Sequence, residues 1–80
     1  MNNGYTVYYE YFKDDDAEGY NVIFPAMPEI VTWGRTMEEA KANATEALTC
    51  HIKGMKRDGD QLPQDISVEN PLVVDKISVV

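Results

Sequence analysis

The chain has 80 residues and a formal net charge of −7, from 14 acidic and 7 basic side chains. This acidic balance disfavours sequence-independent binding to nucleic acid, which depends on neutralising phosphates, and it favours a basic protein partner. A hydrophobic content of 44% predicts a folded domain rather than a disordered chain. We expect a single domain over residues 1–80, with a small core that gains stability from a partner or from self-association.

The sequence predicts a cytoplasmic protein that does not enter a membrane. No apolar run approaches the roughly 20 residues that cross a bilayer. The first residues lack the basic start and apolar core of an export signal. The only cysteine, Cys50, has no partner for an internal disulfide, which fits a reducing compartment.

Three strands are predicted before residue 34. Residues 5–12 alternate between two aromatic-rich faces, as half-buried strands do. The acidic run 14–19 ends in glycine and predicts a hairpin turn into a second strand at residues 20–24. Pro25 and Pro28 cannot donate ladder hydrogen bonds and end that strand, and a short third strand is expected at residues 30–33. Gly34 then permits backbone angles that a side chain would disfavour.

A long helix is predicted over residues 37–57. Thr36 and Glu39 form a capping box, in which the hydroxyl accepts from a free helix N–H and the carboxylate returns to the cap. Asp58 and Gly59 supply the stop. Gly54 leaves two interpretations open, close packing or a break in the helix. One apolar stripe runs along the helix at three- and four-residue steps: Met37, Ala40, Ala44, Ala47, Leu48, His51, Ile52 and Met55.

A final valine-rich strand is predicted over residues 73–80. It completes an α+β fold with the order β-β-β-α-β, in which one long helix packs on one face of an antiparallel sheet. An exposed edge strand invites pairing with a second chain. We therefore predict a homodimer, or a dimer of dimers, with an interface that includes Val73, Val74, Ile77 and Val79. An ordinary edge strand protected by Asp75 and Lys76 is the alternative.

Three clusters could carry chemistry, and we interpret each as structural. A divalent-metal site at Asp14, Asp15, Asp16 and Glu18 is disfavoured, because carboxylates on one exposed turn point into water rather than converging on ions. Adjacent helix positions turn Cys50 and His51 apart, and no second cysteine or histidine completes a tetrahedral site. The basic group Lys53, Lys56 and Arg57 compensates the helix dipole.

The aromatic residues have a different interpretation. Trp33 and the tyrosines could stack single-stranded nucleic acid, but the acidic charge opposes that use. Tyr8 and Phe12 lie on the strand face opposite Val7, so one aromatic row is predicted in the core and the other at a helix or a partner.

The ordered string from the second strand into the helix resembles the HicB-like antitoxins of bacterial and archaeal toxin–antitoxin pairs. The likeness extends over roughly residues 5 to 65, most of a chain of single-domain size. Two positions depart from the family pattern: Ala26 replaces an acidic residue and Glu29 replaces a glycine. The matching residues are Phe24, Pro25, Pro28, Gly34, Thr36, Glu38, Glu39, Ala40 and Ala44.

The resemblance implies a function and a partner. The fold would be a truncated ribonuclease H-like sheet, in a short form without a DNA-binding tail, and the dimer would join through the C-terminal region. The partner would be a small basic HicA-like toxin that cleaves messenger RNA, and the antitoxin would act by occluding it. No catalytic, metal or cofactor-binding residue is then expected. The alternatives are a HicB-like dimer with a binding or scaffold role and no toxin, and a degenerate metal-dependent nuclease.

Overall fold

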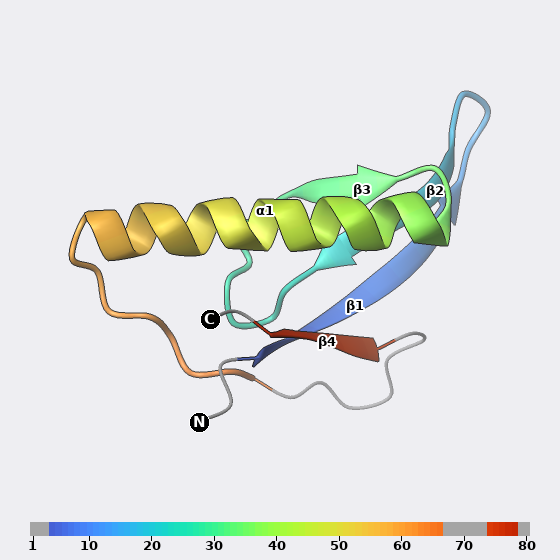
Figure 1. Ribbon diagram of the computed structural model, residues 1–80. Coiled ribbons are helices and arrows are strands. Elements are labelled where there is room, and N and C mark those ends of the chain that lie inside the picture. Colours follow the sequence, from blue (N-terminus) through green and yellow to red (C-terminus); the bar gives the residue numbers. More distant parts are fainter. Residues whose placement is uncertain (1–3, 67–73, 79–80) are drawn as a thin grey trace.

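The computed structural model describes residues 4–66 and 74–78, which form a four-stranded sheet and one helix (Figure 1). The sheet order is β3-β2-β1-β4, and each neighbouring pair is antiparallel. Helix α1 lies across one face of this sheet, so the predicted α+β fold with the order β-β-β-α-β is confirmed. The elements are β1 Gly4–Lys13, β2 Glu18–Ile23, β3 Thr32–Gly34, α1 Met37–Arg57 and β4 Val74–Ser78.

The third strand begins later than the sequence predicts. Residues 30 and 31 precede β3, which covers only Thr32–Gly34. Two successive turns occupy the preceding segment, because the Met27 N–H donates to the Phe24 carbonyl at 3.0 Å and the Ile30 N–H donates to the Met27 carbonyl at 3.1 Å. Ile30 is therefore a buried loop residue rather than a strand residue.

The core lies between α1 and the sheet face that it covers. Alternate residues of β1 and β2 point towards the helix, as the period of two requires. Four helix residues at three- and four-residue steps meet them. The buried residues are Tyr5, Val7, Tyr9, Val22, Phe24, Met27 and Ile30 from the sheet and its loop, and Ala40, Ala44, Leu48 and Ile52 from α1.

Helix α1 has the predicted bounds and capped ends. The Thr36 hydroxyl accepts from the Glu39 N–H at 3.1 Å, whereas the Glu39 carboxylate lies 3.5 Å from the Arg35 N–H rather than at the cap itself. At the other end, Gly59 has a φ of 77° and the chain forms a Schellman motif. Gly54 causes no break, because α1 runs through it, and an added Cβ would meet only the Arg57 side chain at 3.9 Å.

Gly34 has a steric role instead of the conformational one that the sequence suggested. Its φ does not lie in the left-handed region, where Gly59 alone among the described glycines is found. A Cβ at Gly34 would stand 2.3 Å from the Ala40 nitrogen and 2.6 Å from the Ala40 Cα. Absence of a side chain thus lets β3 approach the first turn of α1.

Where β2 no longer pairs with β1, the Asp65 side chain accepts the hydrogen bond that a neighbouring strand would otherwise accept. Strand β2 pairs with β1 only from Tyr8 onwards. Beyond that point, Asp65 accepts from the Thr6 N–H at 2.7 Å and from the Thr6 hydroxyl at 2.6 Å. Close by, the Tyr5 hydroxyl donates to the Pro63 carbonyl at 2.6 Å, so the segment after α1 is fastened to β1.

Candidate protein-binding site

The sheet face away from α1 presents large apolar side chains. We call it the open face, because no helix of the described residues covers it (Figure 1). Val31 is 89% exposed and Trp33 is 44% exposed, and neighbouring exposed apolar side chains are more informative than single ones. The open face consists of Tyr8, Glu10 and Phe12 of β1, Asn21 and Ile23 of β2, Val31, and Trp33 of β3.

Strand register brings the open-face residues together. Tyr8 lies opposite Ile23, Glu10 lies opposite Asn21, and Asn21 in turn lies opposite Trp33. The Phe12 and Trp33 rings meet edge to face with centroids 5.8 Å apart. Such a geometry stabilises an aromatic pair, so the two rings form a preformed platform rather than two independent side chains.

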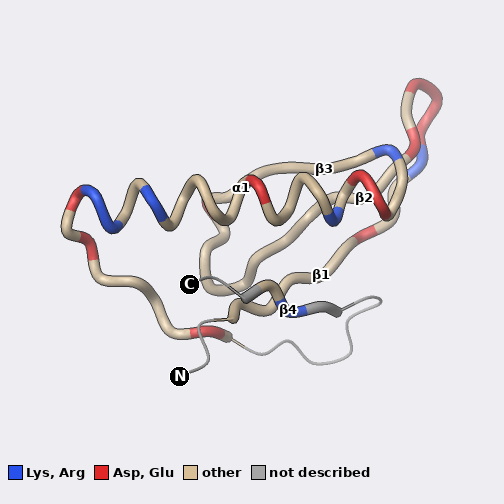
Figure 2. Tube along the Cα trace, viewed as in Figure 1, with Lys and Arg blue, Asp and Glu red and all other residues tan. Residues whose placement is uncertain are grey.

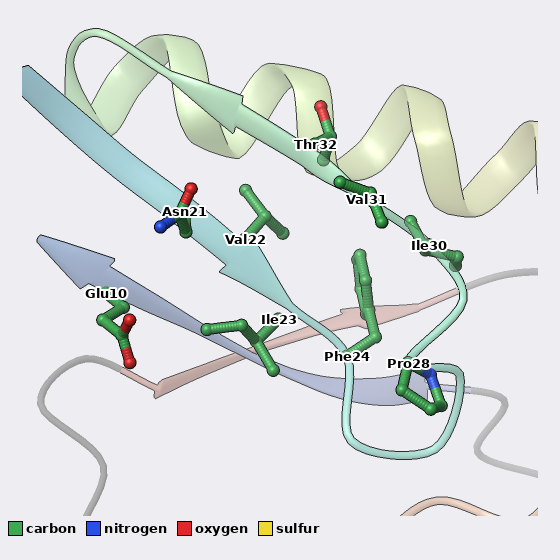
Figure 3. Close-up of a pocket in the computed structure, with 9 residues that line it drawn as sticks. All are labelled: Glu10, Asn21, Val22, Ile23, Phe24, Pro28, Ile30, Val31 and Thr32. Carbon is green, nitrogen blue, oxygen red and sulfur yellow. The ribbon is translucent and has the colours of Figure 1, made fainter. Parts of the chain in front are cut away.

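A hollow of about 310 Å³ opens on this face, where the loop between β2 and β3 leaves the sheet (Figure 3). Ile23, Pro28 and Val31 supply apolar walls, and Glu10 and Asn21 supply polar groups. The hollow exists because the turns before β3 carry the chain away from β2, which separates Val31 from Ile23. It can therefore accept an apolar stem beside a carboxylate.

Charge is distributed unevenly along the molecule, although Asp58 and Asp60 also place acidic residues beside the basic end of α1 (Figure 2). Acidic residues crowd the hairpin between β1 and β2, which projects beyond the start of α1, whereas Lys53, Lys56 and Arg57 lie at the far end of the helix. Lys13 and Arg35, at the base of the hairpin, only partly offset that acidity. The open face is thus bordered by negative charge at its hairpin end.

The acidic hairpin has the geometry of a turn rather than a metal site. The Asp14 carboxylate accepts from the Asp16 and Ala17 N–H groups at 2.9 and 2.8 Å, as side chains that nucleate turns do. Glu18 instead accepts from the Tyr11 hydroxyl. Within residues 4–66 and 74–78, no group of three or more acidic, histidine or cysteine side chains is placed to hold a metal ion.

Cys50 and His51 do not act as a pair. Cys50 is exposed, and His51 Nε2 lies 2.9 Å from the Glu29 carboxylate in the loop before β3. The backbone N–H of Glu29 and then the His51 side chain hold the pKa of Glu29 below its ordinary value, despite slight desolvation. The histidine therefore joins α1 to the loop, and Glu29, which departs from the family pattern, is its partner.

The predicted dimer interface on β4 falls partly outside the described residues. Val73 and Val79 lie outside them, and Val74 is described only through its backbone pairing with Tyr8. Ile77 lies opposite Tyr5 and is packed against the core. Its side chain is therefore directed to the covered face, and the interface prediction concerns the backbone of β4 rather than this side chain.

Two features of the site escape sequence reasoning. Nothing near Asp65 in the sequence marks it as the partner of Thr6, because the contact joins segments 59 residues apart. The hollow depends on turns that place Val31 away from Ile23. The sequence does mark Glu10, because it is the one carboxylate in the aromatic stretch 5–12 and alternates onto the same face as Tyr8 and Phe12.

Most of the chain matches a known family model. Residues 5–76 match the model described as the HicB_like antitoxin of bacterial toxin–antitoxin systems. Within the described residues, no helix combines the length and apolar character that a membrane crossing requires.

Two curated relatives share part of the sequence. One is an uncharacterised 14.9 kDa protein from the rep-hol intergenic region of Haemophilus phage HP1, 40% identical over 52 residues, which span 65% of this chain and 39% of the phage protein. The other is a UPF0150 protein of Thermoplasma acidophilum, 36% identical over 55 residues, which span 68% of this chain and 80% of that protein.

A solved structure has the same fold. The crystal structure of the N-terminal domain of Burkholderia pseudomallei antitoxin HicB superposes with a TM-score of 0.74 at 24% identity, and the match covers 96% of this chain and 98% of that domain. At this identity, the likeness concerns the fold.

Proposed function

Because the chain belongs to the HicB-like antitoxin family of bacterial toxin–antitoxin systems, we propose that it neutralises a small, basic, HicA-like toxin that cleaves messenger RNA. The antitoxin binds the toxin directly and covers the surface that would otherwise engage RNA. The observation that carries this proposal is the family match over residues 5–76. A cytoplasmic location follows from the proposal, because the messenger RNA that the toxin attacks is cytoplasmic.

Charge and site geometry support binding rather than catalysis. A net charge of −7 attracts a basic protein and repels RNA. Within the densest group of carboxylates, Asp14 accepts from the backbone of its own turn and Glu18 accepts from Tyr11. The open face offers an exposed tryptophan, and aromatic side chains are the ones that most often anchor protein interfaces. In this proposal the protein performs no chemistry of its own.

The experiment is co-expression with the product of an adjacent gene that encodes a small basic protein of the HicA-like type. Cells that express the toxin alone should stop growing, and cells that also express this protein should recover. The two proteins should co-purify in a fixed ratio. Arrest that persists despite folded antitoxin, together with no co-purification, would leave the alternative of a HicB-like scaffold without a toxin.

A second assay addresses the nuclease alternative. Purified protein incubated with RNA and magnesium or manganese should leave the RNA intact. The matched control replaces Asp14, Asp15, Asp16 and Glu18 with their amides. Cleavage by the wild type that this variant lacks would contradict the antitoxin proposal.

We further propose that the protein self-associates as a homodimer, or as a dimer of dimers, through the outer edge of β4. In the described residues β4 pairs only with β1, on one side. The Thr6 N–H turns to Asp65, so Thr6 and Lys76 form a pair that does not exchange ladder bonds. The backbone N–H groups of alternate residues of β4, Ser78 among them, therefore point to the outer side of the strand.

This geometry selects the variant for the test. Ser78→Pro removes a backbone donor on the outer side of β4, and Ser78→Ala is its control, because it keeps that donor. Ile77→Pro would instead disrupt the ladder with β1. In light scattering over a concentration series, we expect Ser78→Pro to shift towards monomer and Ser78→Ala to behave as the wild type does. A wild type that stays monomeric at high concentration would refute self-association.

A further inference from the structure

The hollow on the open face combines an apolar trough with one carboxylate. Ile23, Pro28 and Val31 line the trough, and Glu10 lies at its side with Asn21 opposite on β2 (Figure 3). An aliphatic stem of several methylene groups with a cationic head matches this arrangement, and lysine and arginine have such side chains. The chemistry of the hollow therefore favours a basic side chain as its occupant.

The surroundings favour a basic protein over a second copy of this chain. A second copy would bring another net charge of −7 and another Glu10 carboxylate to the same face, which like-charge repulsion disfavours. A basic partner meets the same groups with attraction. The Phe12–Trp33 platform lies beside the hollow and offers the aromatic contact that often anchors such interfaces.

We propose that the open face is the surface that receives the toxin, with a lysine or arginine of the toxin seated in the hollow against Glu10. The inference rests on the proposed function and adds to it the location and the chemistry of the contact. The acidic hairpin beyond the start of α1 steers the approach, and Trp33 and Phe12 supply the apolar contact. Helix α1 and its basic end take no part.

The test measures binding of the co-expressed basic toxin to four variants. Glu10→Lys reverses the charge in the hollow, and Trp33→Ala removes half of the platform. Each should weaken binding about tenfold or more, as loss of a central interface contact does. Glu10→Gln should give a smaller loss, because the amide retains hydrogen bonding but not charge. Glu46→Lys is the matched control for charge, because Glu46 is exposed on α1, and it should bind as the wild type does.

A spectroscopic readout locates the contact independently. Trp33 is the only tryptophan of the chain, so 5-fluorotryptophan incorporated into this protein alone reports on the open face by fluorine NMR. Its resonance should shift when toxin is added to the wild type and to Glu46→Lys. Circular dichroism of each variant establishes that a loss of binding is not a loss of fold.

The outcomes separate the two proposals. A wild type that binds no toxin would overturn the proposed function and this inference with it. Toxin that binds wild type, Glu10→Lys and Trp33→Ala with equal affinity, and leaves the fluorine resonance unmoved, would overturn this inference alone. A resonance that shifts with the concentration of this protein by itself would assign the open face to a second copy.

Discussion

The two faces of the sheet use similar side chains for different purposes. Along β1, Val7 and Tyr9 are almost fully buried under α1, while Tyr8 and Phe12 on the same strand reach the open face. Aromatic content therefore does not identify the core of this protein. What separates the faces is the alanine-rich stripe of α1, since a helix can approach closely only where its side chains are small. The covered face determines the fold, and the open face is available for binding.

The largest expected loss of stability comes from a substitution on the covered face, and a matched substitution on the open face tests whether the two faces differ. Leu48 is fully buried against the covered face, and Leu48→Ala should lower the free energy of unfolding by about 3 kcal/mol through loss of packing and the cavity left behind. Val31→Ala on the open face should change it by less than about 0.5 kcal/mol. Urea denaturation measures both. Equal losses would show that the open face also supports the fold in solution.

The second effect concerns the close contact between Gly34 of β3 and Ala40 of α1. Gly34→Ala places a methyl group 2.3 Å from the Ala40 nitrogen, closer than atoms can pack. Overpacking of this kind should cost about 2 to 3 kcal/mol, because backbone must move on both sides. The denaturation midpoint measures the loss, and an unchanged midpoint would mean that β3 and α1 separate easily.

The third effect concerns the contact between Asp65 and Thr6, in the part of β1 that β2 does not reach. Burial raises the pKa of Asp65, but hydrogen bonds from Thr6 and the charge of Lys76 outweigh it, so the pKa of this carboxyl lies below its ordinary value. Asp65→Ala should cost about 2 kcal/mol at neutral pH, since it leaves the Thr6 N–H without its acceptor.

The pH dependence of this contact has a definite sign. A lowered pKa in the folded state means that the ionised carboxylate stabilises the fold above the unfolded pKa of about 3.9, and that this contribution is lost as the pH falls through the lower folded value. Asp65→Asn is the control, because it keeps an acceptor for Thr6 but cannot titrate. The stability difference between wild type and this variant should shrink below about pH 4. A constant difference down to pH 2 would contradict the assignment.

The smallest expected effect is a gain in stability, from a substitution on α1 rather than on the sheet. Gly54→Ala adds a methyl group with no close neighbour, inside a continuous helix. It should stabilise the protein by about 1 kcal/mol through helix propensity. Thermal denaturation tests this, with Ala42→Gly on the exposed side of α1 as the reverse control. A loss of stability at position 54 would reveal packing that the helix geometry does not show.

Local patterns predicted the elements well because their causes are local. The capping residue Thr36 and the stop at Gly59 fixed α1, and the alternation in β1 fixed its two faces. The predictions are wrong where turn geometry or contacts between distant residues determine the structure. The prediction that the third strand starts at Ile30 is wrong by two residues, because the sequence after Phe24 does not reveal the two turns that precede β3. Gly34 was assigned a conformational role because only the tertiary structure reveals its contact with Ala40.

The fastening of Thr6 by Asp65 has a consequence for the order of folding. Strands β1 to β3 and α1 follow one another along the chain and can form from short-range contacts, which form quickly. The first half of β1 must wait, because Asp65 and β4 are its described partners and both come after the helix. During synthesis, that stretch therefore remains unprotected until the ribosome has made residues well beyond α1. We expect its amide hydrogens to exchange with solvent sooner than those of the β1–β2 hairpin, which marks the β1–β4 junction as the place where the domain first opens.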